Sequence, residues 1–173
     1  MQFLYRMEKA VMRSEEYAVI ALLSSLVVLQ LTQVLFRYVL RLPLPWAPEL
    51  SRFVFVWMIM IGAGLASAKA AHFSVDFLVE SMPRRLRRVF YVVAYAAVLL
   101  FAVVLVRWGV QFAAGAGGQL TASLRVPYTV PYSGLVVGGV LMCYHGLMAV
   151  PIQLAKLRGG ENTGDRAAQE RSR

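Results

Sequence analysis

Residues 37–78 read RYVLRLPLPWAPELSRFVFVWMIMIGAGLASAKAAHFSVDFL. The apolar centre of this stretch, Phe53–Ala68, has sixteen residues and no charge. At about 1.5 Å of rise per residue, such a helix covers about 24 Å, less than the roughly 30 Å hydrocarbon layer of a bilayer. We therefore expect the helix to begin earlier, near Pro48, and Arg52 and Lys69 to extend their charged ends toward opposite membrane surfaces.

The segment before this helix is a short loop that contains three prolines within residues 43–48. Proline fixes φ and lacks an N–H, so the loop can be neither a regular helix nor a central strand. A connection this short predicts that the helices on either side are adjacent and antiparallel. Trp46 lies just outside the helix, where indole rings favour the membrane interface. Glu49 falls in the first turn, where the helix dipole favours an anion, and its spacing from Arg52 allows the two to pair.

Apolar residues make up 59% of the 173 residues, which is too high a fraction for a soluble domain of this length. Four long stretches carry no charge if His145 is neutral: Tyr17–Phe36, Phe53–Ala68, Val89–Val106 and Val126–Ala155. The sequence predicts an all-α integral membrane protein with four transmembrane helices. We expect one domain over residues 1–155, with spans at about 17–36, 48–69, 84–106 and 131–150, and a disordered cytoplasmic tail over 156–173.

The distribution of the 18 lysines and arginines predicts the orientation of these spans. Three precede the first span, and the successive loops carry three, five and two; five more follow the last span. With both chain ends in the cytoplasm, the inner side carries 13 of these cations and the outer side five. This is the positive-inside pattern, so we expect both ends to be cytoplasmic. The same pattern accounts for the net charge of +9 without any binding of nucleic acid.

The segment His72–Met82 alternates apolar and polar residues, but a lone strand at a membrane surface would leave its backbone groups unpaired. As a helix, it places His72, Asp76 and Glu80 on one polar stripe. We therefore expect an interfacial amphipathic helix between the second and third spans. Pro83 would end it and open the third span.

A dense cationic cluster follows, made of Arg84, Arg85, Arg87 and Arg88. Cations at the start of a helix oppose its dipole, so they do not serve helix stability. We expect them, together with Lys69, to orient the chain and to bind anionic lipid headgroups.

Polar and small residues inside the spans predict contacts between helices. Gln30, Thr32 and Gln33 are expected to find partners on other helices, as polar groups in membranes commonly do. Small residues four positions apart allow helices to approach closely. These pairs are Gly62 with Ala66, Gly64 with Ala68, and Gly134 with Gly138.

The sequence offers little for catalysis or cofactor binding. His72 with Asp76 supplies only two ligands for a metal, and the lone Cys143 is expected to be an inert buried thiol. A haem would need two axial histidines, and the chain has two, His72 and His145. None of the nine acids falls within the charge-free stretches, and Glu49, Asp76 and Glu80 lie at span boundaries, which argues against a self-contained ion-coupled carrier. We predict a non-enzymatic protein without cofactor that supports a partner, with a stand-alone cytochrome-like redox protein as the alternative.

A set of residues around the second span forms a more specific pattern: Arg37-Tyr38, Trp46, Glu49-Leu50, Arg52, Gly62-Ala63, and His72 with Val75-Asp76-Phe77-Leu78. This pattern resembles the small membrane subunit, of the DctQ type, of tripartite ATP-independent periplasmic (TRAP) transporters. The family usually has two adjacent acids after the tryptophan, and here Pro48 holds the place of the first.

The resemblance implies a multi-pass protein of the bacterial inner membrane that works with a large membrane subunit and a periplasmic substrate-binding protein. It implies sodium-driven import of an organic acid, such as a dicarboxylate, keto acid or sialic acid, with the small subunit as a fixed scaffold. The motif residues become candidates for the large-subunit interface: Arg37, Tyr38, Trp46, Glu49, Leu50, Arg52, Gly62, His72 and Asp76. No residue is assigned to the substrate.

Overall fold

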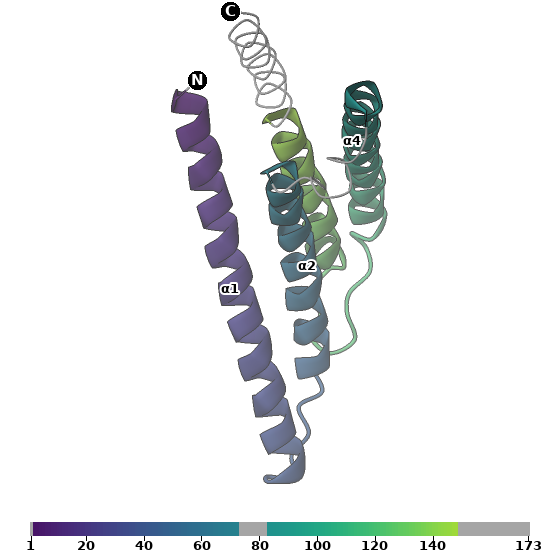
Figure 1. Ribbon diagram of the computed structural model, residues 1–173. Coiled ribbons are helices and arrows are strands. Elements are labelled where there is room, and N and C mark those ends of the chain that lie inside the picture. The colour runs from purple at the N-terminus through teal and green to yellow at the C-terminus, as the bar shows by residue number, and fades with distance from the viewer. Residues whose placement is uncertain (1, 73–82, 149–173) are drawn as a thin grey trace, which may run out of the picture.

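The computed structural model describes residues 2–72 and 83–148 (Figure 1). In this part of the chain α1 spans Gln2–Tyr38, α2 spans Ala47–His72 and α4 spans Arg84–Gly115, and a further helix spans Thr129–Met148. Each of these four helices contains a segment long and apolar enough to cross a membrane. The described residues form no regular strand. The predicted all-α fold with four membrane-spanning helices is therefore confirmed.

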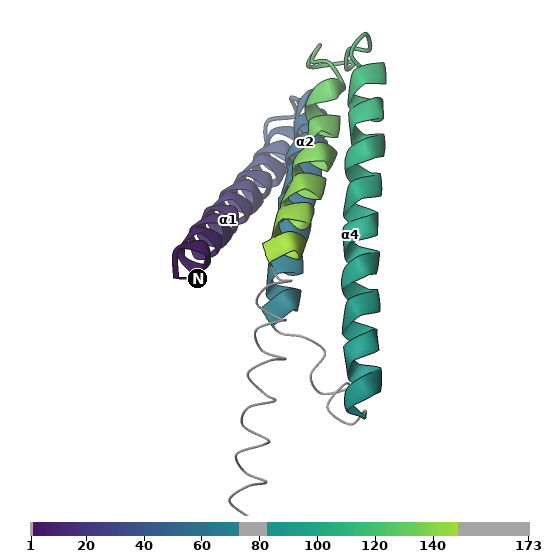
Figure 2. The ribbon, with the colours of Figure 1, turned by 90° about the horizontal axis from the view of Figure 1, so that it is seen from above.

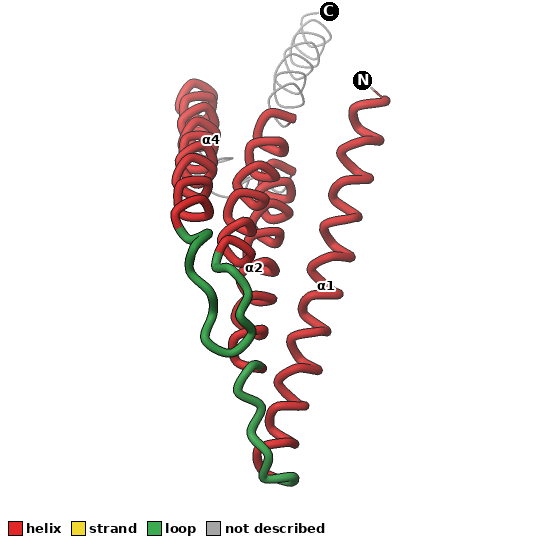
Figure 3. Tube along the Cα trace, turned by 180° about the vertical axis from the view of Figure 1, so that it is seen from behind, coloured by secondary structure: helices red, strands yellow, loops and turns green. Residues whose placement is uncertain are grey.

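The helices run alternately up and down the bundle (Figure 1). The short connection after Tyr38 makes α1 and α2 antiparallel neighbours, as predicted. Figure 3 shows the connections 39–46 and 116–128 toward the same end of the bundle, which we call the loop end. The start of α1, the end of α2 and the start of α4 lie at the opposite end, which we call the N-terminal end (Figure 1).

The Thr129–Met148 helix lies between α2 and α4 (Figure 2). Glycines on two of its sides permit this position. A Cβ added at Gly138 would lie 2.8 Å from the Met60 carbonyl oxygen of α2, and one at Gly139 would lie 3.2 Å from the Val106 nitrogen of α4. Such short separations require the backbones themselves to be in near contact. The close approach predicted from Gly134 and Gly138 is confirmed, since both face α2.

The glycines of α2 behave differently from one another. A Cβ at Gly64 would lie 2.8 Å from the Leu141 Cβ, so this position belongs to the packed interface. Ala68, its predicted small partner, is fully buried. By contrast, no neighbouring atom lies within 4 Å of a Cβ added at Gly62. Gly62 therefore does not mediate helix packing among the described residues.

Two helices extend further than the charge-free stretches indicated. α1 begins at Gln2, so residues 2–16 continue the first span as one helix. α4 continues beyond residue 106, the predicted end of the third span, to Gly115. Membrane boundaries are set by where charges reach water, and a helix can continue past that depth with its own hydrogen bonds intact. The prediction therefore located the ends of the charge-free stretches, whereas the helices themselves continue past them.

The start of α4 agrees with the prediction, because Pro83 is its N-cap and the helix begins at Arg84. Arg84–Arg88 form its first turns. Of the amphipathic helix predicted over His72–Met82, residues 73–82, which include Asp76, lie outside the described residues, as does the tail over 156–173.

We predict that both chain ends are cytoplasmic. The alternating helices bring the start of α1 and the end of the Thr129–Met148 helix to one end of the bundle, as four spans require (Figure 1). The 13-to-5 division of cations gives the sign of the orientation. A C-terminal fluorescent fusion should be bright and a C-terminal alkaline phosphatase fusion inactive. Active phosphatase at that end would refute this orientation.

Candidate functional site

At the loop end, Glu49 binds the loop that follows α4. Both of its carboxylate oxygens accept the Ser123 N–H, at 3.1 and 3.2 Å, and Oε2 also accepts the Leu124 N–H at 2.9 Å. The pairing expected with Arg52 is not formed, and the Arg52 side chain is exposed. Two adjacent backbone N–H groups engage both oxygens of the Glu49 carboxylate. An exposed pair with a long arginine side chain contributes little, so it does not compete with these hydrogen bonds.

The loop bound by Glu49 has further internal order. Thr121 is almost fully buried, and its Oγ1 accepts the Val126 N–H at 3.2 Å. The Thr121 N–H donates to the Val126 carbonyl oxygen, and Leu120 pairs with Pro127 in an isolated bridge. Arg125 has a φ of 55°, in the left-handed region that side chains rarely adopt. These contacts close a turn between Thr121 and Val126, and its Ser123 and Leu124 N–H groups bind Glu49.

We predict that Glu49→Gln loosens this loop, because a neutral amide accepts weaker hydrogen bonds than a carboxylate. Hydrogen exchange at the Ser123 and Leu124 amides should become several-fold faster, while exchange in the middle of α2 stays unchanged. Arg52→Gln is the matched control and should leave both amides as they are. Equal exchange in Glu49→Gln and the unmodified chain would show that the carboxylate does not hold the loop.

A groove of about 460 Å³ opens between α1 and the start of α2 at this end. It is lined mainly by apolar side chains, with hydroxyls from α1: Ser24, Ser25, Val28, Leu29, Thr32, Leu44, Trp46, Ala47 and Leu50. Two of the motif candidates, Trp46 and Leu50, therefore come together. Arg37 and Tyr38 lie at the exposed end of α1. The structure thus brings together only part of the candidate set.

The remaining described candidates of the motif, Gly62 and His72, do not line this groove. Gly62 lies on α2 with open space beside it, and His72 is the last residue of that helix.

The helix contacts expected of the polar residues in α1 are confirmed for Gln30, whose Oε1 accepts the Ser51 hydroxyl of α2 at 3.3 Å. In addition, the Trp57 Nε1–H of α2 donates to the Val130 carbonyl oxygen at 3.1 Å.

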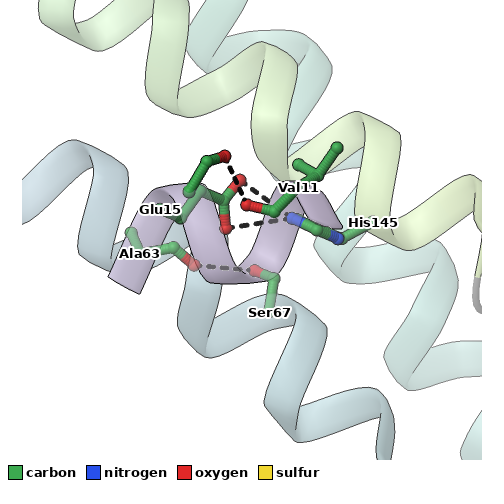
Figure 4. A network of polar contacts seen from close by, with 6 residues as sticks. Val11, Glu15, Ala63, Ser67 and His145 are labelled. Atoms are coloured by element: carbon green, nitrogen blue, oxygen red, sulfur yellow. Dashed lines mark hydrogen bonds and ion pairs between the residues drawn. The ribbon is translucent and has the colours of Figure 1, made fainter. Parts of the chain in front are cut away.

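The N-terminal end contains a polar contact that the sequence did not indicate. His145 Nε2 lies 2.9 Å from Glu15 Oε1 and 3.1 Å from Oε2 (Figure 4). The exposed fractions of the two side chains are 0% and 4%. Nearby, Lys69 Nζ of α2 lies 2.8 Å from Glu16 Oε1, in an ion pair that is half exposed. Lys69, expected at lipid headgroups, thus has a protein partner.

This arrangement bears on the metal and haem interpretations. The described residues contain no group of three or more potential metal ligands. His145 is one of the two histidines that a haem would need, and its Nε2 is engaged by Glu15. The other, His72, ends α2. The redox alternative is therefore not favoured.

Residues 26–155 match the family model of the DctQ component of tripartite ATP-independent periplasmic transporters. The chain belongs to this family. The sequence resemblance is thereby confirmed, and the chain is a small permease subunit of a TRAP transporter and a multi-pass protein of the bacterial inner membrane.

Several relatives of this DctQ-family chain have assigned transport roles. The C4-dicarboxylate TRAP transporter small permease protein DctQ of Vibrio cholerae is 26% identical over an alignment of 157 residues, which covers 77% of this chain and 68% of the relative. The sialic acid TRAP transporter small permease protein SiaQ of the same species is 25% identical over 141 residues, 82% of each chain. The sialic acid TRAP transporter permease protein SiaT of Haemophilus influenzae is 26% identical over 122 residues, and the match spans 20% of its length.

Proposed function

We propose that this DctQ-family chain is the fixed scaffold subunit of a sodium-driven, binding-protein-dependent transporter that imports an organic acid. The observation that carries the proposal is the packing of the Thr129–Met148 helix, whose glycines bring its backbone against both α2 and α4. Helices in backbone contact do not slide past one another without breaking their packing. Such a unit suits a stationary support for a moving partner.

The loop end adds to the same argument. Glu49 ties the connection between α4 and the last helix to the start of α2, so three helices share one fixed end. The motif residues Trp46 and Leu50 line a groove beside this end. We propose that this side of the chain, with Arg37, Tyr38 and the open position at Gly62, contacts the large subunit. For Arg84–Arg88 we propose contacts with anionic lipid headgroups.

The relatives support the proposed partner and substrate class. The SiaT relative is a permease of which only 20% matches this chain, so most of that permease lies beyond the shared region. This favours a large membrane partner for the present chain, and a periplasmic binding protein completes the proposed system. The two small-permease relatives are named for a C4-dicarboxylate and for sialic acid, which are both carboxylic acids.

Reconstitution tests this function. Proteoliposomes should take up a dicarboxylate or sialic acid under a sodium gradient only when this chain, the large membrane subunit and the binding protein are all present. The chain alone should transport neither. Omitting the chain from the complete set is the matched control. Sodium-driven uptake by the chain alone would contradict the scaffold function, and full uptake without the chain would contradict its requirement.

A further inference from the structure

The helix α1 is held to the rest of the bundle in an unusual way. Among its residues 6–38, the buried side chains are both acidic, namely Glu8 and Glu15, with exposed fractions of 3% and 4%. Many of its large apolar side chains face outward, such as Val28 at 63% and Leu31 at 60% exposed, whereas others, including Leu22, Leu26 and Leu29, are half-buried. No large apolar side chain among residues 6–38 is fully buried, so apolar packing within this chain defines the position of α1 only loosely.

Polar contacts join α1 to its neighbours instead, and they differ in strength. The Glu16–Lys69 pair is half exposed, and such pairs contribute little. The Gln30–Ser51 hydrogen bond is long, at 3.3 Å. Glu8 also has an interaction partner. In the Glu15–His145 contact, both side chains are almost completely buried and both carboxylate oxygens are engaged.

The geometry of this contact is directional. The His145 Nε2 lies between the two carboxylate oxygens of Glu15, at 2.9 and 3.1 Å, and this fixes both the depth and the rotation of α1 at Glu15. The imidazole is itself held by Tyr144, whose ring meets it edge-on with centroids 5.1 Å apart. Because the pair is shielded from water, moving α1 away would leave two polar groups without partners in an apolar environment.

We propose that Glu15 and His145 together set the position of α1 against the Thr129–Met148 helix. They act as positioning residues for a helix whose apolar surface is left bare by the rest of the chain. This assignment concerns the isolated chain and does not depend on the transport function proposed above. It predicts that α1 loses its defined position when either partner is removed, and regains it when the two residues are exchanged.

Distance measurements between spin labels in lipid nanodiscs test this assignment. Labels at Ile20 of α1 and Leu147 of the last helix, both exposed, would be placed in a chain with Cys143→Ser. The background should give one narrow distance distribution. Glu15→Leu and His145→Leu should each at least double its width. Combining both leucine substitutions should also leave it broad, because two leucines pack without a fixed direction.

The exchange variant, Glu15→His with His145→Glu, provides the decisive comparison. It restores a carboxylate–imidazole pair across the same two helices, so the narrow distribution should return. Glu16→Gln is the matched control, since it removes a neighbouring but exposed ion pair and should change nothing. A narrow distribution in Glu15→Leu, or a broad one in the exchange variant, would overturn the assignment. If the single leucine variants do not fold, the exchange variant alone decides.

Discussion

Replacing Gly138 with leucine is expected to lower the free energy of unfolding of the isolated chain by about 3 kcal/mol, the upper end of the usual range for overpacked sites. The first added atom, the Cβ, would lie 2.8 Å from both the carbonyl oxygen and the Cβ of Met60. A side chain could rotate away, but the α2 backbone at Met60 cannot. The whole Thr129–Met148 helix would have to shift from α2, which would also disturb Gly134 against Trp57.

The matched control is Gly62→Leu, the same chemical change on the neighbouring helix. No neighbouring atom lies within 4 Å of a Cβ at Gly62, so there is nothing in the described chain for leucine to displace. Leucine also favours helix over glycine by somewhat less than about 1 kcal/mol. Unfolding in mixed micelles with increasing sodium dodecyl sulfate should place Gly62→Leu near the unmodified chain and Gly138→Leu far below it. Similar stability for both variants would mean that the helices are not in backbone contact.

His145→Leu is the second substitution with a large expected effect, a loss of about 3–5 kcal/mol, which is typical when one partner of a buried pair is removed. The Glu15 carboxylate is 4% exposed, and without His145 it loses the imidazole Nε2 that both of its oxygens contact. A buried carboxylate without a partner must either stay charged in an apolar site or take up a proton, and both cost free energy.

The double substitution Glu15→Leu with His145→Leu should recover most of that stability, because apolar replacement of a buried ionic pair is often neutral or stabilising. The same micelle titration measures His145→Leu and the double variant. A single variant as stable as the unmodified chain would show that water reaches Glu15 once His145 is removed. The double variant can regain stability while the position of α1 stays poorly defined. The micelle titration and the spin-label distances therefore measure different properties of the Glu15–His145 pair.

Much of the fold could be predicted from local sequence. The absence of charge over Tyr17–Phe36 and the three other apolar stretches indicates membrane helices directly, because charges inside lipid are costly. The short proline-rich connection after Tyr38 left α1 and α2 no arrangement except side by side. Gly134 and Gly138 indicated a close helix contact, although the sequence could not say that α2 would be the partner.

The polar contacts could not be predicted, because they join residues distant in the sequence. Glu15 and His145 are 130 positions apart, and a glutamate beside a second glutamate reads as exposed in any local pattern. Glu49 has an arginine three residues away, so spacing favoured Arg52, whereas the loop that binds Glu49 lies 74 positions further on. The folded chain places the Ser123 and Leu124 N–H groups at the Glu49 carboxylate, which local spacing had paired with Arg52.

The central claim is that this chain functions as the small subunit beside a large membrane subunit. Native mass spectrometry of the affinity-tagged chain, co-expressed with a membrane protein similar to the unmatched part of the SiaT relative and extracted with its lipids, tests this most directly. We predict a complex that contains both proteins in a fixed ratio and that persists when loosely bound lipid is removed. Recovery of the intact, folded chain alone, with the large protein absent from every charge state, would contradict the account.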